Sequence, residues 1–135
     1  MAKVAVNPHS LAKPVGFSYG FEVRGGRILF LAGQVAFDKD GKIVGRGDIV
    51  AQFRQICENF KTVVEFQGGK LQDIVKLTIY VLDKQKYRAS SKAIGQVYRE
   101  YFGRHYPAMT LVEVKALYDE TEGAMLEIDG FAALD

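Results

Sequence analysis

The sequence contains a single cysteine and no long run of apolar residues. Cys57 stands alone among the 135 residues, so an internal disulfide is excluded. No segment approaches the roughly 20 consecutive apolar residues of a membrane-spanning helix, and the first residues hold no apolar stretch of signal-peptide length. We therefore expect a cytoplasmic protein, with Cys57 as a packing thiol on the apolar side of a helix.

Neither sign of charge dominates the chain. Lys and Arg number 18 and Asp and Glu number 16, without any long run of like charges. Because phosphate contacts dominate the affinity of proteins for nucleic acids, a chain without a basic stripe is not expected to bind RNA or DNA. His9 and His105 lack metal-ligand spacing, and the chain has neither a phosphate-binding loop nor a serine-hydrolase elbow. We expect no metal and no cofactor.

Length and hydrophobic patterning predict one α+β domain over residues 1–135. The first fifteen residues are expected to be irregular. Gly25-Gly26 between two apolar runs is typical of a β-hairpin, because glycine accepts positive φ. Asp48 is expected to cap the first helix, which should end at Gly68-Gly69. The patterns predict strands at 17–23, 28–32, 74–82, 109–114 and 124–132, a short extended piece at 42–44, and a second helix at 85–102.

Two helices of this length cover only one face of such a sheet. Residues 28–32 are nevertheless apolar at five consecutive positions, so both faces of that strand need cover. The economical partner for the second face is another copy of the same sheet. The sequence thus predicts a symmetric homo-oligomer.

Carboxylates occur inside the last two predicted strands. Strand alternation places Glu127 and Asp129 on one face of the last strand, opposite Leu126 and Ile128. The same parity argument adds Glu113, so up to three acids are expected in a partly buried cleft between subunits. Each acid could be neutralised across the interface, with Lys115 as a candidate partner. Alternatively, desolvation and mutual repulsion raise one pKa and create a general acid or base.

Four segments together resemble one known family. They are Ala32-Gly33-Gln34, the strand with its lead-in at 71–81, the stretch Tyr106–Val114, and Leu126-Glu127-Ile128. These segments are similar to those of the reactive intermediate deaminases, the RidA or YjgF-like proteins, also labelled endoribonuclease L-PSP. The resemblance implies a chorismate-mutase-like sheet of about six strands with two helices on one face. It also implies a homotrimer with a small-molecule cleft between neighbouring subunits.

The resemblance implies an activity as well as an altered site. Deaminating members hydrolyse 2-imino or 2-enamino acids to 2-oxo acids and ammonia, and hold the substrate carboxylate with an arginine. That arginine position is Met109 here, while two family hydroxyls are replaced at Phe17 and Ala32. Glu127 matches the glutamate that positions the hydrolytic water, and is the expected catalytic residue. The expected ligand-binding residues are Phe17, Tyr19, Gly33, Met109, Leu111, Glu113 and Asp129.

Three functions remain open from the sequence. The first is a hydrolytic deaminase of a reactive imine or enamine. Because a thioether cannot pair with a carboxylate, its ligand is expected to be neutral or cationic, unless Arg24, Arg27 or Arg104 supplies the missing charge. The second is a non-catalytic, small-molecule-binding or chaperone-like trimer. The third, a ribonuclease or translation inhibitor, is disfavoured by the balanced charge.

Overall fold

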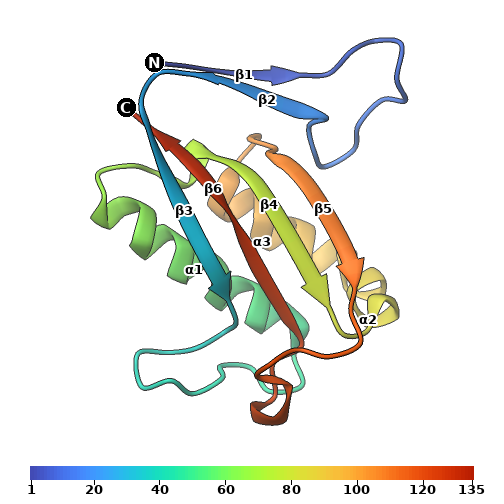
Figure 1. Cartoon of the computed structure of the whole chain (residues 1–135). Helices are drawn as coiled ribbons and strands as arrows, with labels where there is room; N and C mark the ends of the chain where they lie inside the picture. Colours follow the sequence, from blue (N-terminus) through green and yellow to red (C-terminus); the bar gives the residue numbers. More distant parts are fainter.

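A computed structural model describes residues 1–135, and Figure 1 shows its two sheets and the helices packed against one of them. A two-stranded ribbon precedes a four-stranded main sheet. The elements in chain order are β1 (Ala2–Val6), β2 (Gly20–Arg24), β3 (Arg27–Gln34), α1 (Ile49–Phe66), β4 (Ile74–Val81), α2 (Lys84–Ala89), α3 (Ser91–Phe102), β5 (Ala108–Glu113) and β6 (Leu126–Leu134), with short 3₁₀ turns at Leu71–Asp73 and Glu120–Glu122.

The main sheet has the strand order β3-β6-β4-β5. β6 pairs antiparallel with both β3 and β4, whereas β4 and β5 run parallel. The helices lie on one face of this sheet and leave the other face uncovered (Figure 1). The α+β class with helices on one face, expected from the sequence, is confirmed.

The first helix begins directly after Asp48, the residue that the sequence predicted as its cap. The Asp48 side chain accepts hydrogen bonds from the backbone N–H groups of Val50 and Ala51, both at 3.1 Å, and so satisfies two free donors of the first turn. The helix ends at Phe66, just before the expected glycines. None of the helices combines the length and the apolar character needed to cross a bilayer.

The second predicted helix is divided in two, so the expectation of one helix over 85–102 is wrong. α2 ends at Ala89 and α3 begins at Ser91, with the intervening Ser90 at φ −98° and ψ 8°. Adjacent serines favour such a break because their side chains compete for backbone hydrogen bonds. Asp83 caps α2 by accepting from the N–H of Gln85 at 2.9 Å. The break starts a new helix at the residues that line the cavity described below.

The predicted hairpin across Gly25-Gly26 is also wrong. β2 pairs with β1, and β3 pairs with β6, so the two strands flanking the glycines lie in different sheets. Both glycines do have positive φ, but the chain uses this freedom to change sheets. Gly26 is also needed for space, because a Cβ there would lie 2.4 Å from the Leu134 carbonyl oxygen.

Two short segments differ from expectation in opposite directions. The residues expected to be irregular include β1, which is extended because all five of its residues pair with β2. In contrast, the expected extended piece at 42–44 forms only an isolated bridge between Phe37 and Ile43. Segments this short carry too few side chains for their periodicity to be decisive. In both segments, the presence or absence of a neighbouring strand to pair with determines whether a strand forms, and not the local sequence preference.

The ribbon lies across one end of the main sheet (Figure 1). Lys3 of β1 donates to the Asp73 carboxylate, and also to the Ala133 carbonyl oxygen at 3.1 Å. At the other end of the ribbon, the Ser18 N–H donates to the Pro107 carbonyl oxygen at 3.0 Å. These contacts fix the segment before β2 beside the start of β5.

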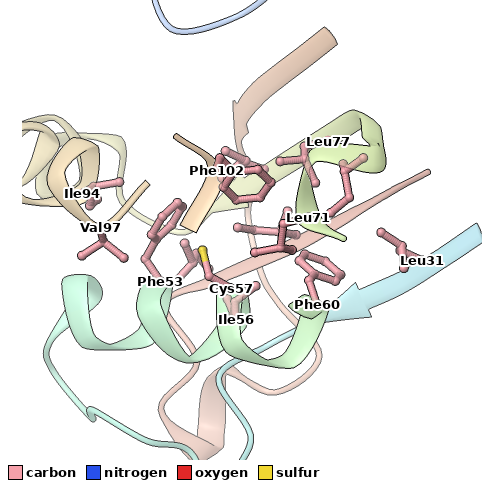
Figure 2. Packing of buried hydrophobic residues seen from close by; sticks show 14 of the residues in the cluster. Leu31, Phe53, Ile56, Cys57, Phe60, Leu71, Leu77, Ile94, Val97 and Phe102 are labelled. Atoms are coloured by element: carbon pink, nitrogen blue, oxygen red, sulfur yellow. The ribbon is translucent and has the colours of Figure 1, made fainter. Parts of the chain in front are cut away.

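The hydrophobic core fills the space between the helices and the main sheet (Figure 2). Cys57 is 2% exposed there, and burial raises the pKa of its thiol to about 12, so it is the packing residue expected from the sequence. On the uncovered face, Phe30 is 72% exposed and Ile28 is 65% exposed. The chain therefore leaves an apolar surface where the sequence predicted a need for cover.

Two phenylalanines of α1 provide a matched test of this core. Phe60 is 2% exposed, whereas Phe66, at the end of the same helix, is 87% exposed. Phe60→Ala should lower the free energy of unfolding by about 3–5 kcal/mol, because it removes buried area and leaves a cavity. Phe66→Ala should change it by less than about 0.5 kcal/mol. Urea denaturation followed by circular dichroism measures both, and equal losses would contradict the assignment of the core.

Candidate functional site

An acidic group lies on the uncovered face of the main sheet. Glu127 and Asp129 project from β6 on this face, and Tyr80 of β4 stands opposite Glu127 in the strand register. The Tyr80 hydroxyl donates to the Asp129 carboxylate over a long contact of 3.4 Å. Both acids are partly buried. The face that carries them is the one that the sequence predicted for a subunit interface.

Gly33 provides the space that Glu127 occupies. The pairing of β3 with β6 is irregular between Leu31 and Gln34, and Gly33 falls within this irregular segment. A Cβ on Gly33 would lie 2.2 Å from the Glu127 Oε2 atom, so any larger residue would displace the carboxylate. Positive φ is not the reason for this glycine. Its role is the close approach of the Glu127 carboxylate to the β3 backbone.

The surroundings of Glu127 favour its protonated form. Burial raises the pKa of Glu127, and the negative charges of Asp119 and Asp129 raise it further. The pKa of Tyr80 is raised as well, by burial first and then by the charge of Asp129. A carboxyl group whose pKa is raised holds its proton to higher pH, and can exchange it with a bound substrate and a water molecule. Glu127 is therefore the strongest acid–base candidate on this face.

The acids predicted to converge do not all lie on one face. In the parallel pairing of β5 with β4, Met109 is opposite Leu77, which belongs to the core. Met109, Leu111 and Glu113 therefore share the helix side of the sheet. The Glu113 carboxylate accepts a hydrogen bond from the Lys84 N–H at 2.9 Å, at the start of α2.

The expectation that Glu113 joins Glu127 and Asp129 is thus wrong. Alternation relates residues within one strand, but it does not relate β5 to β6. In the structure β4 lies between these two strands, and its pairing with each of them sets which residues share a face. The sequence contained no signal for this register.

Met109 lines a cavity of about 450 Å³ on the helix side. The cavity lies between α1, α2 and α3 on one side and β4, β5 and β6 on the other, and residues of the loop before β2 also line it. Hydrophobic side chains form most of its wall. The lining residues are Val15, Gly16, Phe53, Cys57, Phe60, Leu77, Ile79, Tyr87, Ser91, Ile94, Gly95, Tyr98, Arg99, Phe102, Tyr106, Met109 and Ile128. Sequence reasoning did not predict this cavity, because its lining residues resemble ordinary core positions.

The segment containing Phe17 lies near the Met109 side of the sheet. Ser18 forms a parallel bridge with Ala108, so this segment runs beside the start of β5. The rings of Phe17 and Tyr19 meet edge to face with centroids 5.3 Å apart. The Tyr19 hydroxyl donates to the Ala12 carbonyl oxygen at 2.6 Å, which fixes its loop.

The candidate residues therefore form two separate groups. Glu127, Gly33 and Asp129 lie on the uncovered face, whereas Met109 and Leu111 lie on the helix side of the edge strand β5. Leu111 is 41% exposed at that edge. The sheet separates the two groups within one chain.

The charge of Asp129 provides a test of the electrostatics around Glu127. Asp129→Asn should lower the pKa of Glu127 toward the ordinary glutamate value, because one of the neighbouring negative charges is removed. A carbon-detected NMR titration of the side-chain carboxyl groups measures this shift. Asp40→Asn, in an exposed loop, is the matched control and should leave the pKa of Glu127 unchanged.

The same raised pKa has a defined effect on stability. Between the unfolded-state and the folded-state pKa of Glu127, the folded protein binds more protons than the unfolded chain, so stability falls as the pH rises through that window. In Asp129→Asn this fall should be smaller. An unchanged pKa of Glu127 in Asp129→Asn would show that the two carboxylates do not interact.

Comparisons with known proteins agree with this architecture. The model of the family described as Endoribonuclease L-PSP matches residues 10–134. A RutC family protein of Pyrococcus horikoshii is 37% identical over 131 residues, covering 96% of this chain and 97% of the relative. The crystal structure of the Rid family protein YyfB from Yersinia pestis aligns with a TM-score of 0.87 at 34% identity, covering 99% of this chain and all of that one. RidA from an Antarctic Psychrobacter aligns with a TM-score of 0.68 at 27% identity, covering 91% and 92% of the two chains. This chain therefore belongs to the RidA/YjgF family.

Proposed function

We propose that this protein is a hydrolytic deaminase of a reactive imine or enamine, working as a homotrimer with a ligand site between neighbouring subunits. The observation that carries the proposal is the Glu127 carboxylate, which is partly buried, has a raised pKa and lies against Gly33. This arrangement suits a group that takes a proton from water and returns it to a leaving amine. No further ionisable group or metal is needed for that step.

Sheet geometry supports a site made from two copies of the chain. The family resemblance implies that Glu127 and Met109 border one cleft. Within a single chain they lie on opposite sides of the main sheet, with β4 between their strands. A cleft that contains both residues must therefore combine the uncovered face of one copy with the β5 edge of another. The exposed side chains of Phe30 and Ile28 would be buried if the uncovered face associates with another copy of the chain, which favours this association.

The proposed reaction is balanced by one water molecule. Water adds to the carbon of the protonated C=N group while Glu127 accepts a proton from the water, which gives a neutral carbinolamine. Glu127 then delivers this proton to the nitrogen. The C–N bond breaks as Glu127 accepts the hydroxyl proton, so a C=O group forms and ammonia is released. Glu127 passes the last proton to the ammonia, which leaves as ammonium, and so returns to its ionised starting form. The raised pKa of Glu127 favours the second proton transfer without preventing the first.

Met109 argues against a typical small 2-imino acid as the substrate. A thioether cannot replace a charge-assisted pair with the substrate carboxylate, and loss of such a pair costs on the order of 2–5 kcal/mol of binding. A second candidate function is a non-catalytic, small-molecule-binding or chaperone-like trimer. It is favoured by the absence of hydroxyl groups at Phe17 and Ala32, together with the loss of charge at Met109.

Hydrolysis of 2-iminobutanoate, generated by an amino-acid oxidase in the presence of semicarbazide, tests the proposed function. The native protein should hydrolyse it slowly. Met109→Arg should increase the rate, because the introduced guanidinium pairs with the substrate carboxylate. Adding Glu127→Gln should abolish that gain, whereas Glu65→Gln, at an exposed position of α1, should preserve it. A gain that survives Glu127→Gln would remove Glu127 from the mechanism, and no hydrolysis by any variant would favour the binding function.

Mixed trimers test whether two copies form each site. Light scattering should give three times the chain mass of 15.0 kDa. The Met109→Arg/Glu127→Gln double variant and the native protein should each be slow alone. After unfolding and refolding together they should hydrolyse 2-iminobutanoate faster, because some clefts then combine the introduced arginine with an intact Glu127 from another copy. A mixture no faster than the sum of its components would show that both residues act from one chain.

A further inference from the structure

We propose that the cavity behind Met109 binds carboxylates with a bulky apolar or aromatic side chain, and that Arg99 holds the carboxylate at its rim. The inference rests on the proposed function, since this cavity forms the Met109 side of the proposed cleft. The substrates of that site would then be bulky apolar carboxylates, recognised by α3 and not by position 109. Nothing in the family resemblance assigns a role to Arg99.

The cavity has the size and the chemistry of a ligand pocket. Its volume of about 450 Å³ falls within the range of small-molecule sites, which are mostly apolar with a few placed polar groups. Burial raises the pKa of Tyr87 to about 12, and burial also raises the pKa of Tyr98, so both phenols are neutral at physiological pH. The Tyr98 ring stacks on both Phe102 and Tyr106, with centroids 4.6 and 5.6 Å apart, and all three rings border the cavity. This stack gives the cavity a rigid aromatic border, which suits an aromatic or branched side chain.

Arg99 is the one charged residue among those that line the cavity. Its side chain is exposed at the rim and forms no hydrogen bond or ion pair within the chain. Arg54 shows the contrast, because its guanidinium contacts both carboxylate oxygens of Glu100, at 2.7 and 3.3 Å. The Arg99 guanidinium keeps its paired donors free for a carboxylate, which it can bind in a bidentate manner.

Gly95 lies one turn before Arg99 on α3, and both residues border the cavity. Glycine is less stable than alanine in the interior of a helix. A Cβ at Gly95 would lie 3.4 Å from the Arg99 Nη1 atom, which is an ordinary van der Waals distance. The guanidinium therefore lies beside the glycine at the border of the cavity, and a side chain that extends beyond Cβ at position 95 would compete with it for this space.

This arrangement revises the ligand expected from the sequence. A neutral or cationic ligand followed from the loss of positive charge at Met109, with Arg24, Arg27 and Arg104 as the possible replacements. None of these three lines the cavity. Arg24 pairs with Glu22 at 3.1 Å, and the Arg27 side chain donates to the Asp135 carbonyl oxygen at 3.0 Å. Arg99 supplies the charge instead, from a helix whose distance to Met109 the sequence did not reveal.

Titration calorimetry with three probes tests the pocket. Phenylpyruvate has both the carboxylate and the ring, phenylacetone lacks the carboxylate, and 2-oxobutanoate lacks the ring. The native protein should bind phenylpyruvate at least about tenfold more tightly than either of the others, because each lacks one of the two contacts. Equal binding of 2-oxobutanoate and phenylpyruvate, or no binding of phenylpyruvate, would overturn the proposal.

Two arginine variants locate the carboxylate contact. Arg99→Gln should weaken phenylpyruvate binding about tenfold and leave phenylacetone binding unchanged, since only the charged contact is lost. Arg88→Gln is the matched control on α2, outside the cavity, and should bind phenylpyruvate like the native protein. Thermal denaturation should show the same stability for both variants, because both side chains are on the surface. Unchanged phenylpyruvate binding by Arg99→Gln would overturn the role of Arg99.

Turnover decides the proposed function separately from the pocket. Phenylpyruvate binding that depends on Arg99, in a protein that hydrolyses no imine, would support the pocket and contradict the deaminase. Conversely, the deaminase would be supported and the pocket overturned if hydrolysis depends on Glu127 while phenylpyruvate binding is unchanged in Arg99→Gln. The two failures are thus distinguishable.

Discussion

The alternation of side chains across the four-stranded sheet controls the rest of this structure. Every second residue of β4, β5 and β6 faces the helices, and the intervening residues face outward. This single constraint seals Leu77 and Ile128 in the core and places Glu127 on the uncovered face. It also separates Glu127 from Met109, although both belong to strands of one sheet. A site that uses both residues would need a second copy of the chain, and this is the geometric basis of the proposed assembly.

The uncovered face and the helix side of the sheet are different chemical environments, because water reaches them to different extents. On the helix side, α1 and α3 exclude water and leave an apolar cavity, whose phenols stay neutral because their ionised forms would be desolvated. On the uncovered face, burial is partial, so Glu127 keeps a titratable carboxyl with a raised pKa. The proposed recognition of an apolar side chain suits the first environment, and the proposed transfer of a proton suits the second. In the proposed trimer, a contact between these two sides of neighbouring copies would bring them together without placing an acid inside the core.

Periodicity and caps made much of the fold predictable, whereas pairing and register did not. Asp48 and the apolar spacing of α1 are local signals, so that helix was predicted almost to its ends. The prediction of a hairpin across Gly25-Gly26 was wrong, because glycines with positive φ occur both in hairpin turns and where a chain passes from one sheet to another. The face predicted for Glu113 was wrong, because alternation within β5 does not determine the register of β5 with β4. Arg99 was not among the residues predicted for the site, because helical spacing gives the side of a helix on which a residue lies but not its distance from the next strand, β5.

The residue at position 109 must be compatible with the cavity it lines. An arginine there would bring a charge to a half-buried wall shared with Leu77 and Ile79, and its long side chain would fill part of the cavity. Methionine is apolar and flexible, so it closes the wall without a desolvation cost and adapts to the shape of a ligand. A charge at the rim, on Arg99, remains hydrated until a carboxylate replaces the water. With the role proposed for Arg99, methionine at position 109 leaves more apolar space at the wall while an anion can still be held at the rim. The proposal thus links the methionine at 109 to a preference for bulkier ligands.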